Sequence, residues 1–455
     1  MLSMLGLFLL QLFLLQSEGI QTPESDSKMT VWNLFKFRHS HSPPPATDPP
    51  VSCQDSSSLD VLGLVWWAVF CSVILAVGVG AGWARRGQER TPEEVMVAGR
   101  RLDFFVGILT MAATWVGGGF IIGAAQGVYS NGLLWSQAPV FYSLSLVLGG
   151  LVFAKKMRDS KYLTMMDPFT QKFGRWGSVL VLPAAVSEMI WCAAILSSLG
   201  STLYTILQLD NTISILISAG LSLAYTMFGG LVAVAYTDVL QIIFVMFGLF
   251  LALPFSISHP AVGDLYSTTL EDEVTPVWWG TVEPHQWGSW LDVSLLCLLG
   301  GIPWQSYFQR VLSAQSGGRA VLLSCGGALI ALIVSVPALL FGAVAVSTDW
   351  SQTGRGCEGA PHGDNARYVL PLCLKYLTPR PVSWVGVGVV SAAVMSSADS
   401  SLLSSSSLLA RNVYQRLVRP GCGETELIRS LWVFTIINCV CSTILALHYN
   451  SVYDL

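Results

Sequence analysis

Apolar residues in this chain are gathered into long runs that contain few charged side chains. A helix needs about 20 such residues to cross the roughly 30 Å hydrocarbon core of a bilayer. Window hydropathy predicts ten helical segments, at about 59–84, 103–127, 133–154, 174–207, 211–230, 232–255, 289–308, 320–347, 382–410 and 430–447. The pattern therefore predicts an all-α protein that passes through a membrane many times.

Composition and charge narrow the class of protein further. Hydrophobic residues make up 53% of the chain and charged residues only 11%, whereas soluble globular proteins carry about 25% charged residues. The formal net charge is -4, and no basic face is available to bind nucleic acid. A soluble enzyme and a nucleic-acid-binding protein are both excluded.

Lysine and arginine are concentrated in alternate loops between the predicted helices. Short cytoplasmic loops retain these residues, so the pattern indicates orientation. The basic loops contain Arg85, Arg86, Arg90, Arg100, Arg101, Lys155, Lys156, Arg158, Lys161, Arg310, Arg319, Arg411, Arg416, Arg419 and Arg429. These loops are predicted to face the cytoplasm, and the first membrane helix is predicted to begin outside.

The N-terminal part of the chain differs from the rest. Residues 1–20 begin with an apolar stretch and end in small and polar residues, as a signal peptide does, although the usual basic start is absent. Residues 21–58 are rich in proline and serine and poor in apolar residues, so they are predicted to form a disordered extracellular arm. The membrane domain is predicted at 59–455.

The ten cysteines of the chain show no CxxC or Cys/His spacing. Most of them lie inside apolar runs, where cysteine acts as a small hydrophobic residue. Cys53 and Cys357 lie in segments predicted to be extracellular, where a disulfide is chemically allowed, but the sequence does not pair them. Neither a cysteine-based metal site nor a cofactor is expected.

Two of the apolar segments are interrupted at their centres. The second reads ILTMAATWVGGGFIIGAAQG and the seventh reads LLCLLGGIPWQSYF. Glycine runs and a Gly-Gly-x-Pro step free backbone groups at membrane depth, which is tolerated where those groups line a cavity or bind an ion. Close helix packing through glycine is the alternative. Broken helices five segments apart predict a transporter made of two inverted repeats, with its sites at the breaks.

Five longer strings carry a resemblance to a known family. They are TMAATWVGGGF, WSQAPVFYSLSLVLGGLVFAKKMR, GGLVAVAYTDVLQ, LGGIPWQSYFQRVLS and SAAVMSSADSSLLSSSSLLARNVYQ. Together they resemble the sodium/solute symporter family, and within it the members that transport choline, from about Leu59 to Leu455. The resemblance implies a LeuT-type five-helix inverted repeat with one extra leading helix. It also implies sodium- and chloride-dependent uptake of choline or a related quaternary ammonium ion across the plasma membrane, or in synaptic or vesicular membranes.

The implied substrate calls for aromatic side chains. Its positive charge is spread over methyl groups, and such a cation is bound best by aromatic faces. Trp115 lies well inside its segment and Trp304 directly follows the second break, while the resemblance adds Trp191 and Tyr142. We expect these four residues to form the substrate cage. The alternative is that they anchor or fill the bundle, as most of the other tryptophans are expected to do.

The resemblance also implies a sodium site between the second and ninth segments. Carbonyl oxygens of Ala113 and Val116 in the second segment would face Ala393, Ser396 and Ser397 in the ninth. The spacing of the last three residues puts them on one helix face. Serine in a membrane helix more often bonds to its own backbone, which is the alternative. Sodium is the one metal expected.

Three acidic residues fall inside predicted membrane helices, where charge is costly and usually functional. Asp238 follows a YT pair in a string that contributes to a second sodium site in some family members. Asp399 could tune the first sodium site or bind a second ion, and Glu188 could lend negative potential to a cationic substrate. Structural pairing inside the bundle is the alternative for these residues, and Asp238 could pair with a loop arginine. The chloride site is not located.

The chain departs from the choline-transporting members at two points. It has Ile122, Ala124 and Gln126 where those members carry asparagine, threonine and glutamate after the glycine run. It also reaches its last residue after the tenth segment, so the second repeat is expected to be truncated by one helix. These departures leave the identity of the substrate open.

Two other functions remain open, as does assembly into a homo-oligomer. A truncated, transport-incompetent member of the family could modulate a full-length transporter. More remotely, Asp238 and Asp399 could share a proton and activate water, as in an intramembrane aspartyl protease, although neither lies in the GxGD context of such enzymes.

Overall fold

The computed structural model describes residues 60–84, 91–265, 277–355 and 359–448. The predicted signal peptide and extracellular arm lie outside these residues, as do Cys53 and Cys357. Within the described ranges the chain is helical and contains no strand beyond two isolated β-bridges. The all-α prediction is confirmed.

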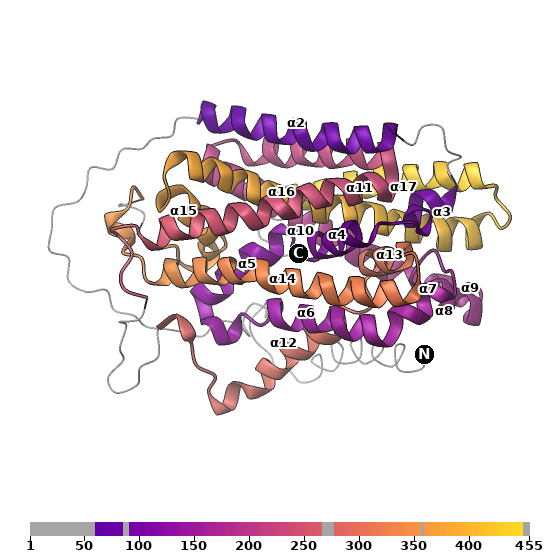
Figure 1. The fold of residues 1–455 in the computed structure, drawn as a ribbon, viewed down its shortest axis with the longest axis horizontal. Coiled ribbons are helices and arrows are strands. Elements are labelled where there is room, and N and C mark those ends of the chain that lie inside the picture. The colour runs from indigo at the N-terminus through magenta and orange to yellow at the C-terminus, as the bar shows by residue number, and fades with distance from the viewer. Residues whose placement is uncertain (1–59, 85–90, 266–276, 356–358, 449–455) are drawn as a thin grey trace, which may run out of the picture. The chain divides into compact units, whose positions relative to one another are not determined.

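Long apolar helices make up most of the described chain (Figure 1). Seven helical stretches are long and apolar enough to cross a membrane, namely Val61–Trp83, Leu133–Asp159, Trp176–Leu207, Gly229–Ile257, Gly317–Val346, Arg380–Val418 and Glu424–His448. An eighth span is formed by the bent pair Phe104–Trp115 and Gly118–Asn131. The other two predicted segments form shorter helices, at Asn211–Ala224 and at Trp287–Gly300 with Gln305–Ser313.

The helices are named here in their order along the chain. They are α2 (Val61–Trp83), α3 (Pro92–Val97), α4 (Phe104–Trp115), α5 (Gly118–Asn131), α6 (Ala138–Gly149), α7 (Lys155–Asp159), α8 (Asp167–Phe173), α9 (Arg175–Val179), α10 (Val181–Leu207), α11 (Asn211–Ile257), α12 (Trp287–Gly300), α13 (Gln305–Ser313), α14 (Gly317–Val346), α15 (Val369–Tyr376), α16 (Arg380–Leu408) and α17 (Glu424–His448). A π-helical turn, η4 (Gly150–Ala154), joins α6 to α7, and a second, η10 (Leu409–Val418), continues α16.

The stretch α11 contains two of the predicted segments, as two helices that meet at a kink. Gly230 interrupts it with φ 56° and ψ -148°, a conformation that favours glycine. A Cβ atom at this position would lie 2.9 Å from the carbonyl oxygen of Val95. The predicted boundary between 211–230 and 232–255 is therefore a sharp kink, where the chain passes close to α3.

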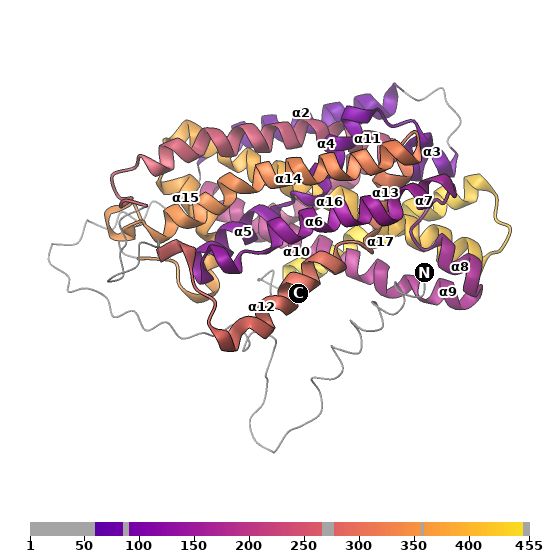
Figure 2. The same cartoon turned by 60° about the horizontal axis from the view of Figure 1, so that its bottom comes forward.

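Helix α16 forms the centre of the bundle. All of its residues from Gly386 to Leu408 are buried, including many serines. It packs against α10 and α11, while α2 covers α11 at the edge of the bundle (Figure 1). Helix α12 diverges from the other long helices (Figure 2). The predicted ninth segment, α16, therefore contacts both broken helices.

Most of the basic loops lie at one end of the bundle. Helices α3, α7, α8, α9 and α13, which adjoin these loops, share the right-hand end in Figure 1, whereas α15 lies at the other end. This grouping agrees with the alternate-loop pattern of lysine and arginine. Arg310 is an exception: it was predicted to lie in a loop, but it lies within α13 and is fully buried.

Candidate functional site

The first predicted break is confirmed between α4 and α5. Helix α4 ends at Trp115, and Val116 then adopts φ -79° and ψ 63°. Gly117 is extended, and α5 starts at Gly118 with its axis bent by 53° from that of α4. The glycines allow α16 to come close, since a Cβ atom on Gly118 would lie 2.2 Å from the Val394 side chain.

The second predicted break is confirmed between α12 and α13. Helix α12 ends at Gly300, and α13 begins at Gln305 after a non-helical step that contains Trp304 with φ -109° and ψ 126°. A Cβ atom on Gly301 would lie 2.5 Å from Ser145 Oγ and 2.9 Å from the Trp115 ring. The Trp115 side chain, at the first break, therefore reaches the second.

The four predicted cage residues form two aromatic pairs at these breaks. The ring centroids of Trp115 and Tyr142 are 5.3 Å apart, and those of Trp191 and Trp304 are 6.1 Å apart with the planes at 84°. The Trp191 ring also approaches the first break, since a Cβ atom on Gly119 would lie 3.5 Å from it. All four side chains are partly buried. The four side chains therefore lie close to the two breaks.

The five predicted sodium ligands also lie on facing elements. Ser396 Oγ donates to the carbonyl oxygens of Ala113 at 3.0 Å and Ala393 at 3.2 Å. Ser397 Oγ is buried and has no hydrogen-bond partner, and it lies 2.2 Å from the position of a Cβ atom on Gly117. The Ser397 hydroxyl therefore points at the non-helical stretch that contains Val116. Carbonyl and hydroxyl oxygens without a carboxylate suit a monovalent cation.

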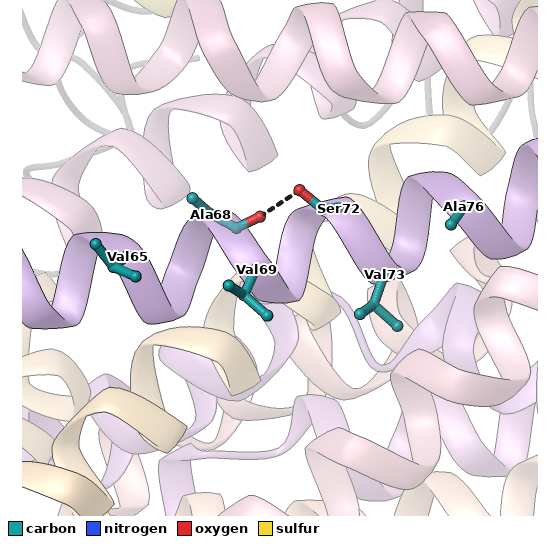
Figure 3. Close-up of a pocket in the computed structure, with 6 residues that line it drawn as sticks. All are labelled: Val65, Ala68, Val69, Ser72, Val73 and Ala76. Carbon is teal, nitrogen blue, oxygen red and sulfur yellow. Dashed lines mark hydrogen bonds between the residues drawn. The ribbon is translucent and has the colours of Figure 1, made fainter.

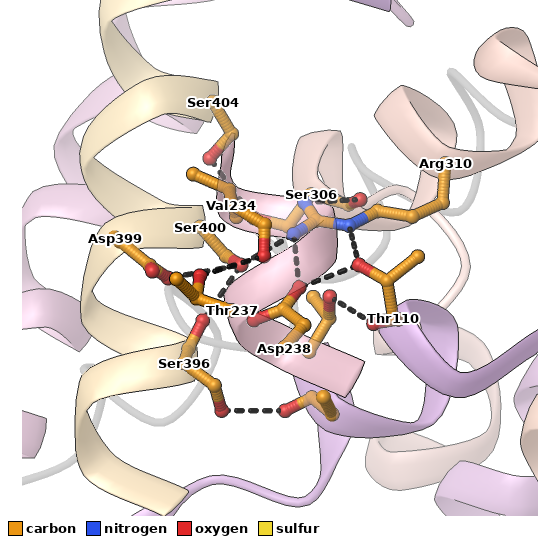
Figure 4. A network of polar contacts seen from close by, with 12 residues as sticks. Thr110, Val234, Thr237, Asp238, Ser306, Arg310, Ser396, Asp399, Ser400 and Ser404 are labelled. Carbon is orange, nitrogen blue, oxygen red and sulfur yellow. Dashed lines mark hydrogen bonds and ion pairs between the residues drawn. The ribbon is translucent and has the colours of Figure 1, made fainter. Parts of the chain in front are cut away.

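A buried polar network lies beside these oxygens (Figure 4). Arg310 forms an ion pair with Asp238 at 3.2 Å, and both side chains have no exposed surface. Thr110 Oγ1 donates to the same Asp238 oxygen at 2.5 Å, and Arg310 donates to Ser400 Oγ at 2.5 Å. Ser400 in turn donates to the Ser396 carbonyl at 2.7 Å. The network thus links α4, α11, α13 and α16 to one of the proposed sodium ligands.

The other two predicted acidic residues are also buried. Asp399 lies next to Ser400, whose hydroxyl is 3.5 Å from Asp399 Oδ1. Glu188 accepts hydrogen bonds from Ser306, at 3.1 Å from its backbone nitrogen and 3.0 Å from its hydroxyl. Asp238 and Glu188 therefore both contact residues of α13, which directly follows the second break.

Sequence reasoning missed Arg310, Thr110, Ser306 and Ser145 as residues of this site. The positive-inside pattern assigned Arg310 to a loop, because the predicted segment ended at residue 308. Its position six residues after Trp304, in the same apolar environment, was the available signal. The ion pair agrees with the alternative that Asp238 pairs with an arginine assigned to a loop, but the sequence did not show which arginine this would be, since Arg310 is 72 residues away.

Ile122, Ala124 and Gln126 lie on α5. Ile122 and Ala124 are buried, and Gln126 is partly buried. The Ala124 carbonyl accepts a hydrogen bond from Ser136 Oγ at 3.1 Å. These residues therefore lie in the second half of the first broken helix, beyond the cage residue Trp115.

A shallow apolar depression lies on the surface of α2 (Figure 3). It is lined by Val65, Ala68, Val69, Ser72, Val73 and Ala76. The hydroxyl of Ser72 donates its proton to the Ala68 carbonyl at 2.7 Å. With no charged side chain in its lining, this surface suits lipid chains rather than a cation.

Other ligand chemistry is not apparent in the described part of the chain. There, no group of three or more His, Cys, Asp or Glu residues could hold a metal ion. The eight cysteines that the structure describes, including Cys297 and Cys373, are unbridged. The two breaks and their surroundings are therefore the candidate site.

Comparison with known proteins identifies the family. The profile of the Sodium:solute symporter family matches residues 95–454. This chain belongs to that family. It is 46% identical to the high affinity choline transporter 1 of Homo sapiens over 401 residues, which cover 87% of this chain and 69% of that protein. It is 45% identical to the high-affinity choline transporter 1 of Drosophila melanogaster over 398 residues, which cover 87% of this chain and 64% of that protein.

A solved structure shows a similar fold. A Na+-coupled sialic acid symporter, determined in a substrate-bound outward-open state, matches with a TM-score of 0.72 and 18% identity, over 86% of this chain and 83% of that one. The predicted LeuT-type fold is confirmed, and the chain is a membrane transporter rather than an enzyme. The hypothesis of an intramembrane aspartyl protease is therefore wrong, and Asp238 forms its ion pair with Arg310.

Proposed function

We propose that this chain takes up choline, or a closely related quaternary ammonium ion, together with sodium across the plasma membrane. One observation carries the proposal: two aromatic pairs lie at two adjoining helix breaks, beside a set of uncharged oxygens. The relatives named as choline transporters support the choice of substrate. A chloride requirement belongs to the same proposal, on the resemblance alone.

The aromatic pairs suit a methylated cation better than they suit a sugar or an amino acid. A desolvated cation–π contact contributes about 2 kcal/mol, and a quaternary ammonium presents methyl groups in several directions. Trp115 and Tyr142 offer one pair of rings, and Trp191 and Trp304 offer another in an edge-to-face arrangement. Rings on different elements can contact several methyl groups of one ion at once.

The proposed sodium site shares a stretch of backbone with the proposed cage. Trp115 lies between Ala113 and Val116, whose carbonyls are the proposed ligands of the second segment. Sodium would draw Ser396 and Ser397 of α16 toward this stretch. Any shift that sodium causes here also moves Trp115, so binding of one cation changes the affinity for the other. This shared backbone is the proposed physical basis of coupling.

For Asp238 we propose a role in coupling rather than a second sodium site. The Arg310 guanidinium already neutralises the carboxylate, and it also donates to the Ser400 hydroxyl at 2.5 Å. The pair joins α11 to α13, and Ser400 continues the contact to Ser396. Asp399, adjacent to Ser400 on α16, is proposed to tune the electrostatic potential of the same network.

The side chains on α5 are proposed to set selectivity. Ile122 and Ala124 are apolar where choline-transporting members carry polar groups, so this half of the broken helix offers fewer hydrogen bonds to the hydroxyl of choline. A related ammonium ion that lacks the hydroxyl would then bind nearly as well. Uptake of choline in competition with tetramethylammonium measures this preference.

The test of the function is uptake of radiolabelled choline into cells that express the chain, with sodium or with N-methylglucamine outside. Replacement of chloride by gluconate tests the chloride requirement. A chimera that adds the part of the human relative beyond the match, and co-expression with that relative, test the other hypothesis, a transport-incompetent modulator. Uptake by the chimera but not by the chain would favour the modulator.

The cage is tested by Trp115→Ala, with Trp66→Ala on α2 as the matched control, because Trp66 is 39% exposed on the outside of the bundle. Loss of one cation–π contact of about 2 kcal/mol corresponds to a KM for choline that is roughly 30-fold higher. The control should keep the KM of the unmodified protein. An unchanged KM in Trp115→Ala would show that the cage assignment is wrong.

A further inference from the structure

Helix α13 begins without a cap from its own sequence. Trp304 occupies the N-cap position, and its indole accepts no hydrogen bond from the helix. The first N–H groups of a helix have no partner within the helix and need an acceptor from elsewhere. Ser306 is 1% exposed, so water does not supply it. The start of α13 is therefore expected to depend on another part of the chain.

The missing acceptor is the side chain of Glu188 on α10. Its Oε1 accepts from the Ser306 backbone N–H at 3.1 Å and from the Ser306 hydroxyl at 3.0 Å, and its Oε2 lies 3.2 Å from the same hydroxyl. Glu188 is 2% exposed, so these contacts lie in a dry environment. An acceptor oxygen at this position satisfies an N–H group that the helix itself leaves unpaired, and a hydrogen bond is stronger in a dry environment. A residue 118 positions earlier thus does what an N-cap side chain normally does.

The same contact joins three elements behind the cage. Ser306 Oγ lies 2.9 Å from Ser404 Oγ on α16, so the start of α13 is held between α10 and α16. On α10, Trp191 follows Glu188 by three residues and lies near it on the helix surface. At the start of α13, Trp304 precedes Ser306 by two residues. Glu188 therefore fixes the distance between the backbones that carry Trp191 and Trp304.

We propose that Glu188 is a positioning residue that caps α13 from α10 and thereby holds the Trp191–Trp304 half of the cage in its edge-to-face arrangement. The inference rests on the proposed function for its consequence in transport, but the cap itself does not. The competing explanation is that the Glu188 charge attracts the cationic substrate directly through space. The two explanations differ in what a neutral hydrogen-bond acceptor at this position would do.

Three variants separate these explanations. Glu188→Gln keeps an oxygen that accepts the Ser306 N–H and removes the charge, whereas Glu188→Ala removes both. Ser306→Ala keeps the backbone N–H of α13 and serves as the matched control for the loss of the hydroxyl contact. Under the capping role, Glu188→Gln keeps most of the function and Glu188→Ala does not. Under direct attraction, both variants lose substrate affinity alike.

The cap is measured without transport, by hydrogen–deuterium exchange of the purified protein in nanodiscs. In Glu188→Ala we expect the amides of residues 305–308 to exchange at least about tenfold faster, as local opening becomes easier. Peptides from α14 should be unchanged. Glu188→Gln and Ser306→Ala should show much smaller changes. Unaltered exchange at residues 305–308 in Glu188→Ala would overturn the cap, whatever the transport assay shows.

The positioning role is measured by the KM and the maximal rate of choline uptake in the same variants. Glu188→Ala should raise the KM at least about tenfold, with sodium affinity and surface expression changed far less. Glu188→Gln should have a KM close to that of the unmodified protein. Faster exchange with an unchanged KM would overturn the positioning role and leave only the cap. An equal rise in KM for both variants would favour direct attraction. If the unmodified chain and the chimera take up no choline, the proposed function and the positioning role both fail, and exchange still decides the cap.

Discussion

At the scale of single residues, the account depends on a few buried polar atoms. Ser397 Oγ has no hydrogen-bond partner, although a buried hydroxyl normally has one. Most of the other serines of α16 are satisfied by their own helix, as Ser406 is by the Leu402 carbonyl at 2.5 Å. The difference identifies Ser397 as a hydroxyl that a ligand can use at no cost to a hydrogen bond within the protein.

Ser397→Ala should therefore weaken sodium binding without weakening the fold. Loss of one of five proposed ligands is expected to raise the sodium concentration for half-maximal uptake about tenfold. This corresponds to a loss of about 1.4 kcal/mol in the free energy of sodium binding. The midpoint of thermal unfolding without sodium should stay the same, since no hydrogen bond is lost. Ser406→Ala, on the same helix, is the control and should leave the sodium dependence unchanged. Equal sodium dependence in both variants would contradict the assignment.

Asp238 and Arg310 form a buried ion pair, in which each side chain neutralises the charge of the other. Removal of one partner from a buried ion pair costs about 3–5 kcal/mol, since the other charge is left unpaired. Asp238→Asn and Arg310→Met should each lower the unfolding midpoint of the purified protein strongly. The double variant should recover a large part of the loss. Additive losses in the double variant would show that the pair contributes little.

At the scale of elements, the two helix breaks determine where the candidate site lies. Both breaks could be predicted, because the glycine run and the Gly-Gly-x-Pro step act locally on the backbone. That α4 and α16 face each other was implied only by the family resemblance, because no local pattern shows which distant helix approaches a break. The cap of α13 by Glu188 was not predicted, because nothing in the string that contains Trp304 indicates a partner 118 residues away.

The close approach of α5 to α16 gives a prediction for Gly118. A Cβ atom there would lie 2.2 Å from Val394, so Gly118→Ala should force the helices apart. Such overpacking typically costs about 1–3 kcal/mol, and sodium-dependent uptake should fall sharply, because the proposed sodium ligands lie across this contact.

The structure supplies both a rescue and a control for this prediction. Val394→Ala in combination with Gly118→Ala should restore uptake in part, because it removes the clashing methyl groups. Gly123→Ala on the same helix should be harmless, since its Cβ atom meets nothing within 4 Å. If Gly123→Ala and Gly118→Ala lowered uptake alike, the close contact with Val394 would not explain the effect.

At the scale of the whole molecule, the two proposed cation sites share one stretch of backbone. Residues 113–116 carry two proposed sodium ligands and one proposed cage residue; α16 contacts them through Ser396, and the break before α13 approaches Trp115 at Gly301. The buried network of Arg310, Asp238 and Ser400 connects these elements. The family fold could be predicted from the sequence, whereas this connection could not, because it joins α4, α11, α13 and α16 through side chains alone.

The central claim is that sodium and the quaternary ammonium ion are coupled through this shared stretch. The direct measurement is binding of radiolabelled choline to the purified protein at several sodium concentrations, paired with binding of radiolabelled sodium at several choline concentrations. The account predicts that each cation tightens the other by the same factor, and that Trp115→Ala weakens choline binding while sodium alone still binds. Choline binding that is independent of sodium, or unchanged in Trp115→Ala, would contradict it.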